Sequence, residues 1–367
     1  MAYMLVPHQV TDTTATIWVG VADENEHGRQ QVMGIEVDDG TETRTVALDA
    51  SGWDTWKSYS QGDDAHYARL DRLLDRVLEV LKRPQIIRTL DYKRITLDNL
   101  RPRTSYSLTL HIEGQAATTS EMHLREARVT TLPAALPDQG QKAFTVLLGS
   151  CFYGPNDEEG MVGRTYYHLP KDRRPDIKIL CGDQVYLDNP WLDTSLRYNG
   201  GNVRRGLFRA GFFQKYLDNW TQVRGEDAGF RQLLKDGANY FCSDDHEFWN
   251  NAPNFGGIGF INTLHSEQRD WWRKQARALF EIFQSPDPLI PFNVGQLSFR
   301  IADTRINRSI TPERFMNDED LSAVGRWIEG LSGPGVLVVG QPVLTEENSY
   351  GKALKADWNR TLWSALD

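Results

Sequence analysis

Three short motifs carry cysteine, carboxylate, tyrosine or histidine side chains, which can bind metal ions or transfer protons, and each motif directly follows an apolar run. The side chains are those of Cys151, of Asp183 and Tyr186, and of Asp245 and His246. Short apolar runs between polar or proline-marked segments are typical of buried strands. Because the ligands of open parallel sheets gather just beyond the carboxyl ends of the strands, we expect the three motifs to meet in one site.

The pentad GDQVY at residues 182–186 suits a metal site. A glycine at a strand end lets the backbone turn closely around an ion, and the Asp183 carboxylate can bridge two cations. The Tyr186 phenolate can reach the same centre. Carboxylate and phenolate oxygens suit a hard trivalent ion, whereas the Cys151 thiolate is softer and leaves Zn, Mn or a second Fe open as well. The same pentad also occurs in loops that bind no ion.

Two adjacent carboxylates and a histidine follow the third apolar run, as Asp244, Asp245 and His246. Burying such a group is costly unless a cation compensates the charge. One interpretation is a solvated turn with a capping aspartate. The functional interpretation makes Asp245 a metal ligand and His246 a general acid beside the metal, with Asn250 and Asn251 donating hydrogen bonds in the pocket.

A fourth apolar run precedes Asp303, Arg305 and Arg308. The planar guanidinium of arginine fits phosphate oxygens in two-point contact, so Arg305 is a candidate phosphate clamp. The alternative is a structural ion pair between Asp303 and Arg305, and the sequence favours neither interpretation.

Composition limits the possible classes of protein. The 367 residues carry a net charge of −9, which argues against a general binder of nucleic acid or anionic membranes. No apolar stretch has the length of a membrane span, and the first residues lack a signal-peptide pattern. We therefore expect a cytoplasmic protein, or a secreted or periplasmic one if a signal was trimmed. The sequence leaves the oligomeric state open.

The three cysteines, Cys151, Cys181 and Cys242, are too few for a disulfide framework. Each alone is most simply a small buried hydrophobe. Cys151 is the exception, because its motif makes it a candidate ligand. Cys181 has no assigned role and is either a buried thiol or a neighbour of the ligands.

The chain divides into two predicted domains. Residues 1–132 read as a β-sandwich, with an amphipathic helix inserted at about 64–83, and residues 133–143 form a proline-marked linker. Leu100 and Pro102 form a corner before the strand that carries Tyr106, as in fibronectin-type-III-like sandwiches. Beyond the linker, residues 144–367 alternate between strand and helix patterns, which indicates a layered α/β domain and an α+β protein overall. The predicted elements are strands at 144–149, 177–181, 238–242, 297–302 and 335–340 and a helix at 263–284.

The motifs together resemble the alkaline phosphatase D (PhoD-like) family of metallophosphoesterases, over nearly the whole chain. The matching elements are Ser150-Cys151 with Gly154, Gly182-Asp183 with Tyr186, Asp244-Asp245-His246-Glu247 with Asn250-Asn251, and Asp303-Thr304-Arg305 with Arg308. The resemblance implies a fibronectin-III-like β-sandwich ahead of a layered αββα domain. It also implies hydrolysis of a small phosphate monoester or phosphodiester by a metal-activated water.

The resemblance implies a role for each matching residue. Cys151, Asp183 and Tyr186 are expected to bind Fe(III), and Asp183 to bridge to a second site, Ca(II) in this family, that Asp245 helps to hold. His246 is expected to protonate the leaving alkoxide. The remaining expectations are a phosphate clamp at Arg305 and substrate contacts at Asn250, Asn251 and Arg308.

The chain departs from the family pattern in one respect. The family supplies further ligands from a Gly-Asp-x-His segment, which is absent here, and the last histidine, His265, falls inside the helix predicted at 263–284. We therefore expect a truncated, split or catalytically degenerate relative. The alternative function is a non-catalytic homologue that binds a phosphorylated ligand or a partner. A purely structural protein is the third interpretation.

Overall fold

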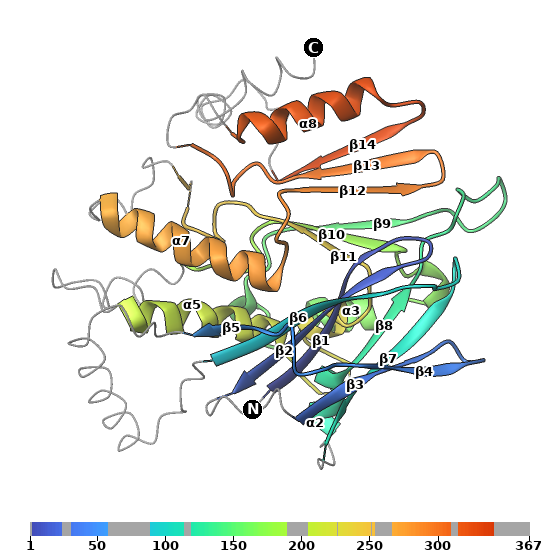
Figure 1. Ribbon diagram of the computed structural model, residues 1–367, viewed down its shortest axis with the longest axis horizontal. Coiled ribbons are helices and arrows are strands. Elements are labelled where there is room, and N and C mark those ends of the chain that lie inside the picture. Colours follow the sequence, from blue (N-terminus) through green and yellow to red (C-terminus); the bar gives the residue numbers. More distant parts are fainter. Residues whose placement is uncertain are drawn as a thin grey trace. The chain divides into compact units, whose positions relative to one another are not determined.

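The computed structural model contains mixed α/β structure with several antiparallel sheets, which confirms the predicted fold class (Figure 1). The residues that the structure describes are 2–23, 31–57, 89–113, 119–188, 205–225, 227–250, 252–253, 266–309 and 315–340. The chain forms two compact units. Unit 1 comprises Met1–Thr131, Gly154–Arg174 and Asn189–Asn239, and unit 2 comprises Leu132–Tyr153, Pro175–Asp188 and Tyr240–Asp367.

The part of unit 1 that the structure describes contains two four-stranded antiparallel sheets. The first has the order β1 (Ala2–Val10), β2 (Ala15–Asp23), β6 (Thr89–Leu97), β5 (Asp54–Lys57). The second has the order β4 (Thr43–Ala47), β3 (Val32–Asp38), β7 (Ser105–Ile112), β8 (Glu126–Thr130), and helix α2 (Thr119–Arg125) directly precedes β8. Along β7, Tyr106, Leu108 and Leu110 are buried while their neighbours are more exposed, the alternation expected of a strand with one face on the core.

The corner before β7 has the expected tyrosine contact. The hydroxyl of Tyr106 accepts a hydrogen bond from the backbone N–H of Arg101 at 2.8 Å. The fibronectin-III-like assignment and the domain boundary at 133–143 stay predictions. The two compact units are defined by packing contacts, which identify neither a type of sandwich nor a linker. The helix predicted at 64–83 lies outside the described residues.

The later segments of unit 1 contribute helices α3 (Met161–Tyr167), α5 (Arg205–Trp220) and α6 (Phe230–Leu234). Arg231 of α6 is fully buried and donates hydrogen bonds to four backbone carbonyls, those of Leu5, His123, Leu124 and Glu126. Asn239, also fully buried, donates to the carbonyl of Pro7 at 2.7 Å. Buried polar groups need such partners, so these two side chains connect α6 and its end to β1.

In its described residues, unit 2 contains two three-stranded sheets and two helices. One sheet has the order β11 (Asn239–Cys242), β10 (Ile177–Cys181), β9 (Val146–Gly149), with β10 parallel to β9. The other has the order β12 (Leu289–Val294), β13 (Leu297–Ala302), β14 (Gly335–Val339), with β13 antiparallel to β12 and parallel to β14. The helices are α7 (Ser266–Phe283) and α8 (Asp318–Glu329).

Aromatic side chains join the two sheets of unit 2. The ring of Tyr240 in β11 stacks on Phe292 of β12 at 4.3 Å between centroids, and Phe292 stacks on Phe299 of β13 at 4.5 Å. Trp327 of α8 donates to the Ser298 hydroxyl at 2.9 Å, which fixes α8 on the second sheet. These contacts give the unit a layered core.

The structure confirms the five strands predicted for this part of the chain, with shifts of one or two residues at some ends. It also confirms the predicted helix from Ser266 on, while residues 263–265 lie outside the described residues. Strand β12 and helix α8 were not predicted. Within the described residues, no helix is long and apolar enough to cross a membrane.

Candidate metal centre

The candidate site forms where β9, β10 and β11 end. Cys151 lies two residues after β9, and its N–H donates to the carbonyl of Gly182, just beyond β10, at 3.3 Å. Gly182 has a φ of 85°, and a Cβ there would lie 2.4 Å from the backbone nitrogen of Asp244. Only glycine permits this close approach, so the first residue of the pentad brings the loops after β10 and β11 together.

Two ligand candidates hold an uncommon backbone conformation. Cys151 and Asp183 each have a φ of 58°, a region that residues other than glycine seldom occupy. Such conformations cost free energy and persist where the surroundings fix them, often at functional sites. The Sγ of Cys151 lies 3.5 Å from Oδ2 of Asp183. The two strained residues therefore present their side chains to the same point.

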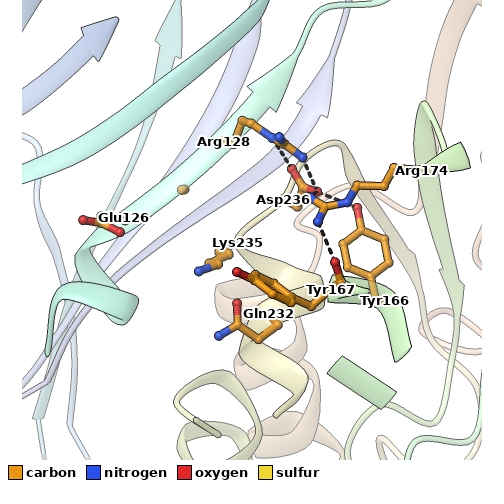
Figure 2. Close-up of a pocket in the computed structure, with 9 residues that line it drawn as sticks. Glu126, Arg128, Tyr166, Tyr167, Arg174, Gln232, Lys235 and Asp236 are labelled. Atoms are coloured by element: carbon orange, nitrogen blue, oxygen red, sulfur yellow. Dashed lines mark hydrogen bonds and ion pairs between the residues drawn. The ribbon is translucent and has the colours of Figure 1, made fainter. Parts of the chain in front are cut away.

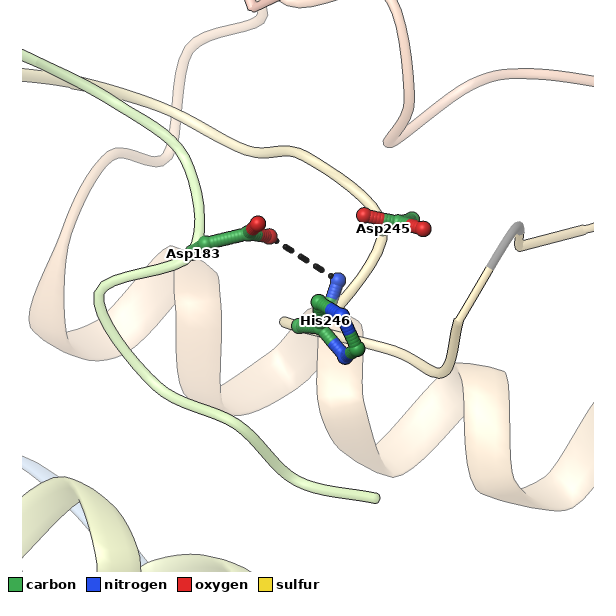
Figure 3. Close-up of side chains that lie close together, drawn as sticks. All are labelled: Asp183, Asp245 and His246. Carbon is green, nitrogen blue, oxygen red and sulfur yellow. Dashed lines mark hydrogen bonds between the residues drawn. The ribbon is translucent and has the colours of Figure 1, made fainter. Parts of the chain in front are cut away.

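Asp183, Asp245 and His246 form a group that can hold a cation (Figure 3). Each offers one ligand atom, and these atoms all lie within 4.8 Å of one another. The backbone N–H of His246 donates to Oδ1 of Asp183 at 3.1 Å, which fixes the two loops in this arrangement. The structure thus brings together the second and third motifs, as the sequence predicts.

The tyrosine of the pentad lies against the same group. The Tyr186 ring stacks on the His246 imidazole with centroids 4.3 Å apart, and its hydroxyl is within hydrogen-bond reach of the Cys151 thiol. Burial, followed by the charges of Asp183 and Cys151, raises the pKa of Tyr186, and burial likewise raises the pKa of Cys151. Without a cation, both side chains therefore stay protonated.

The carboxylates of the site repel one another in the absence of a cation. Burial and the charge of Asp245 raise the pKa of Asp183, while burial and the charge of Asp183 raise the pKa of Glu247. Burial also raises the pKa of Asp244 to about 7, although Arg305 opposes the shift. A bound cation would reverse these shifts, so the donor set and its excess negative charge fit a metal ion.

Glu247 holds two loops of the site together, a role that the sequence did not indicate. Its buried carboxylate accepts the backbone N–H groups of Asp183, Gln184 and Asp244, at 2.8, 2.7 and 3.0 Å. One side chain therefore fixes the loop after β10 against the loop after β11. The position of Glu247 directly after the Asp-Asp-His run indicates that it lies near the site, but not that it accepts these hydrogen bonds.

Asp188 is a second residue that the sequence analysis missed. Its Oδ1 lies 2.8 Å from Nδ1 of His246, and its Oδ2 accepts the backbone N–H of Asn250 at 2.7 Å. Burial lowers the pKa of His246, but the hydrogen bond to Asp188 and the charges of Asp188, Asp245 and Asp183 raise it to about 9. With Nδ1 engaged, Nε2 is the nitrogen of His246 left for chemistry.

The two arginines of the fourth motif are buried. The guanidinium of Arg305 donates to Asp244 at 2.7 Å and to the carbonyl of Ala252 at 2.6 Å. Asp303 does not hold this guanidinium in an ion pair; its carboxylate accepts the backbone N–H of Arg305 at 2.9 Å. Arg308 is only 2 % exposed. The substrate roles of Arg305 and Arg308 stay predictions.

Two further predicted residues are placed only in part. Asn250 is exposed and lies at the site through its backbone contact with Asp188, so a substrate role for its side chain stays a prediction. Asn251 lies outside the described residues. The neighbouring Cys242 lowers the pKa of the Cys181 thiol, whose Sγ lies 3.9 Å from the carbonyl oxygen of Ile179.

Comparisons with known proteins bear on the fold alone. A scan against protein-family models and a search of curated proteins found no match. A solved structure described as that of PhoD is similar, with a TM-score of 0.57 and 16% sequence identity, over 91% of this chain and 61% of that chain. The fold is similar to that of PhoD. The present chain spans about three fifths of the length of the PhoD chain that it matches.

The contact between Asp188 and His246 leads to a first prediction, which rests on the hydrolytic function proposed below. Asp188→Asn is expected to lower kcat by about 10- to 100-fold with little change in KM, because the imidazole loses the partner that orients it. The pH at which activity falls on the alkaline side should also move down, since Asp188 raises the pKa of His246. Steady-state rates across a pH series measure both effects.

The matched control is Asp227→Asn, because Asp227 also pairs with a histidine, His168, at 2.8 Å but in an exposed position of unit 1. This variant should behave as the unaltered protein. An Asp188→Asn protein with unchanged kcat and pH profile would contradict an orienting role for Asp188.

Proposed function

We propose that the protein is a metal-dependent phosphoesterase that hydrolyses small phosphate esters with a metal-activated water. The observation that carries the proposal is the convergence of Asp183, Asp245 and His246 at the ends of neighbouring strands, with ligand atoms within 4.8 Å of one another. The similarity to PhoD in fold supports the same reaction class.

We assign the ligands as follows. Cys151, Asp183 and Tyr186 would hold an Fe(III) ion, and Asp183 and Asp245 would hold a second ion, Ca(II), with Zn and Mn as other candidates for this donor set. Bound metal would supply a water of lowered pKa and would neutralise charge on the phosphoryl oxygens. The contact between the Cys151 thiol and the Asp183 carboxylate supports this assignment.

The side chains of the chain perform the remaining steps. His246 holds a proton at Nε2 and gives it to the leaving alkoxide oxygen, so that a poor leaving group departs as the neutral alcohol. Asp188 holds the imidazole by Nδ1 and stabilises its charged form. Glu247 keeps the loop of Asp183 and the loop of His246 at a fixed separation. Arg305 would act as a phosphate clamp only after its guanidinium leaves Asp244.

Elemental analysis and a hydrolysis assay test the proposal. Protein purified without chelators is expected to contain iron, to show a broad visible charge-transfer band, and to hydrolyse 4-nitrophenyl phosphate or bis(4-nitrophenyl) phosphate. Chelation should abolish the hydrolysis, and added metal should restore it. The ratio of the two rates decides between monoester and diester preference.

The same experiment can refute the proposal. A folded protein that is colourless, takes up no metal on dialysis against iron or calcium, and hydrolyses neither ester would contradict it. The non-catalytic alternative, a protein that binds a phosphorylated ligand or a partner, would then be the better explanation.

A further inference from the structure

A second polar site lies in unit 1, in a pocket of about 210 Å³ (Figure 2). Its wall comes from β8, from the end of α3, from the residue after the short helix Lys171–Arg173, and from α6 with the two residues that follow it. The charged side chains on this wall are Glu126, Arg128, Arg174, Lys235 and Asp236. None of these residues belongs to the candidate metal centre.

One part of the wall is held rigidly around Asp236. Arg128 donates to both carboxylate oxygens of Asp236 at 2.8 Å, and Arg174 donates to one of them at 3.2 Å. The Tyr166 hydroxyl donates to the same carboxylate at 2.8 Å. Two guanidinium groups therefore surround a single carboxylate, which leaves a positive charge in excess.

The backbone holds Arg128 and Lys235 side by side. The N–H of Arg128 donates to the carbonyl of Lys235 at 2.7 Å, and the N–H of Gly237 donates to the carbonyl of Arg128 at 2.7 Å. These bonds pair β8 with residues 235–237, so the two basic side chains leave the backbone from fixed positions.

Both basic side chains retain donors for a ligand. In the part of the chain that the structure describes, neither Nη1 of Arg128 nor Nζ of Lys235 donates a hydrogen bond to protein. Burial, followed by the charge of Arg231, lowers the pKa of Lys235. An anion in the pocket would relieve this cost, because it would compensate the half-buried ammonium group.

The balance of charge and the size of the pocket limit the ligand. Three cations face two carboxylates, and Asp236 is already engaged by both arginines. Figure 2 shows the Lys235 ammonium and the Tyr167 hydroxyl pointing toward the side on which Glu126 lies. The pocket volume of about 210 Å³ gives room for a small anion.

We propose that this pocket binds a small oxyanion, a phosphate or carboxylate group, with Arg128 and Lys235 as its donors. Arg128 offers the free edge of a guanidinium that Asp236 already orients, and Lys235 offers an ammonium group. The ring of Tyr167, which is 42% exposed, covers one flank of the ligand. Glu126 opposes the anion and limits its affinity.

Calorimetric titration of chelated protein tests the proposal, because removal of metal keeps phosphate from binding at the candidate metal centre. Inorganic phosphate and acetate are used as separate probes. Lys235→Met is expected to weaken binding of the recognised probe about tenfold, as one charge-assisted hydrogen bond is lost. Lys171→Met, which removes an exposed lysine of the same unit that does not line the pocket, should leave binding unchanged.

Two further variants keep the proposal falsifiable if Lys235→Met fails to fold. Lys235→Arg should retain binding, and Glu126→Gln should strengthen it several-fold. The proposal is supported if one probe binds, Lys235→Met weakens its binding, Lys235→Arg retains it and Glu126→Gln strengthens it. The probe that binds, phosphate or acetate, then identifies the oxyanion that the pocket recognises. Absence of binding of both probes at tens of millimolar overturns it, as does affinity unchanged in Lys235→Met or in Glu126→Gln.

Discussion

Asp183→Asn is expected to lower the rate of 4-nitrophenyl phosphate hydrolysis by about a thousandfold or more and to remove bound metal. The Asp183 carboxylate is the one group that the proposed function gives to both metal ions, and its side chain lies next to Cys151 and His246. Metal ions contribute several kcal/mol to transition-state stabilisation, which corresponds to a rate effect of about this size. Elemental analysis and initial rates on the same preparation measure both losses.

The same substitution should stabilise the metal-free protein. The folded-state pKa of Asp183 is raised above its usual 3.8, so the ionised form opposes folding at neutral pH. Asparagine removes this charge and can still accept the N–H of His246. The melting temperature of chelated Asp183→Asn should therefore exceed that of the chelated parent near neutral pH. The difference should shrink at acidic pH, where the folded parent is protonated at Asp183.

Asp287→Asn is the control for this pair of effects, since Asp287 is an exposed aspartate of the same unit. It should change neither metal content nor activity. If Asp183→Asn keeps its metal and its rate, Asp183 is not a ligand and the proposed function is wrong. If Asp183→Asn loses metal and activity but the melting temperature of the chelated protein does not rise, the carboxylates of the metal-free site are better solvated than the structure indicates.

His246→Asn should lower the rate about 10²- to 10⁴-fold for substrates with poor leaving groups, because general acid catalysis typically contributes this much. The effect should be far smaller for 4-nitrophenyl phosphate, whose leaving group needs no proton. The expected result is therefore a loss that grows with the pKa of the leaving alcohol. Rates for a series of aryl and alkyl phosphates measure this dependence.

This series also decides whether His246 is a metal ligand or the general acid. Both roles are open because a ring nitrogen of His246 lies within 4.8 Å of carboxylate oxygens of Asp183 and Asp245. If His246 binds metal, His246→Asn loses metal, and all substrates slow by the same factor. If it is the general acid, the metal content stays and only the poor leaving groups are affected. His168→Asn, at an exposed histidine of unit 1, should alter neither property.

The strands of unit 2 were predictable where the sequence shows short, continuous apolar runs, and β10 and β13 begin and end as predicted. Strand β12 lacks this signal, because Pro291 interrupts its apolar residues. The structure explains the proline: β12 is an edge strand of its sheet, where a missing N–H is tolerated. Helix α8 contains Gly325, a weak helix former, and depends on its packing against β13 and β14.

The ligand candidates were predictable because each follows an apolar run directly, and strand ends meet at one edge of a sheet. Asp188 and Glu247 were not, because their roles come from contacts with residues about 60 positions away in the chain, 58 for Asp188 and His246 and 64 for Glu247 and Asp183. The pairing of Arg305 with Asp244 is equally remote. Spacing along the sequence indicates which side chains are available, but tertiary contacts decide which of them hold the others in position.

The hydrogen bonds that Arg231 and Asn239 make to β1 constrain how the polypeptide matures during synthesis. The carbonyls of Leu5 and Pro7 emerge early from the ribosome, but their partners follow 226 and 232 residues later. Until those partners are made, the two carbonyls lack their protein donors, and burying either one without a donor would cost about 1–3 kcal/mol. Contacts of such long sequence separation slow folding. A recombinant fragment that stops at residue 132 would therefore lack part of its own interior, and the two units are best produced as one continuous polypeptide.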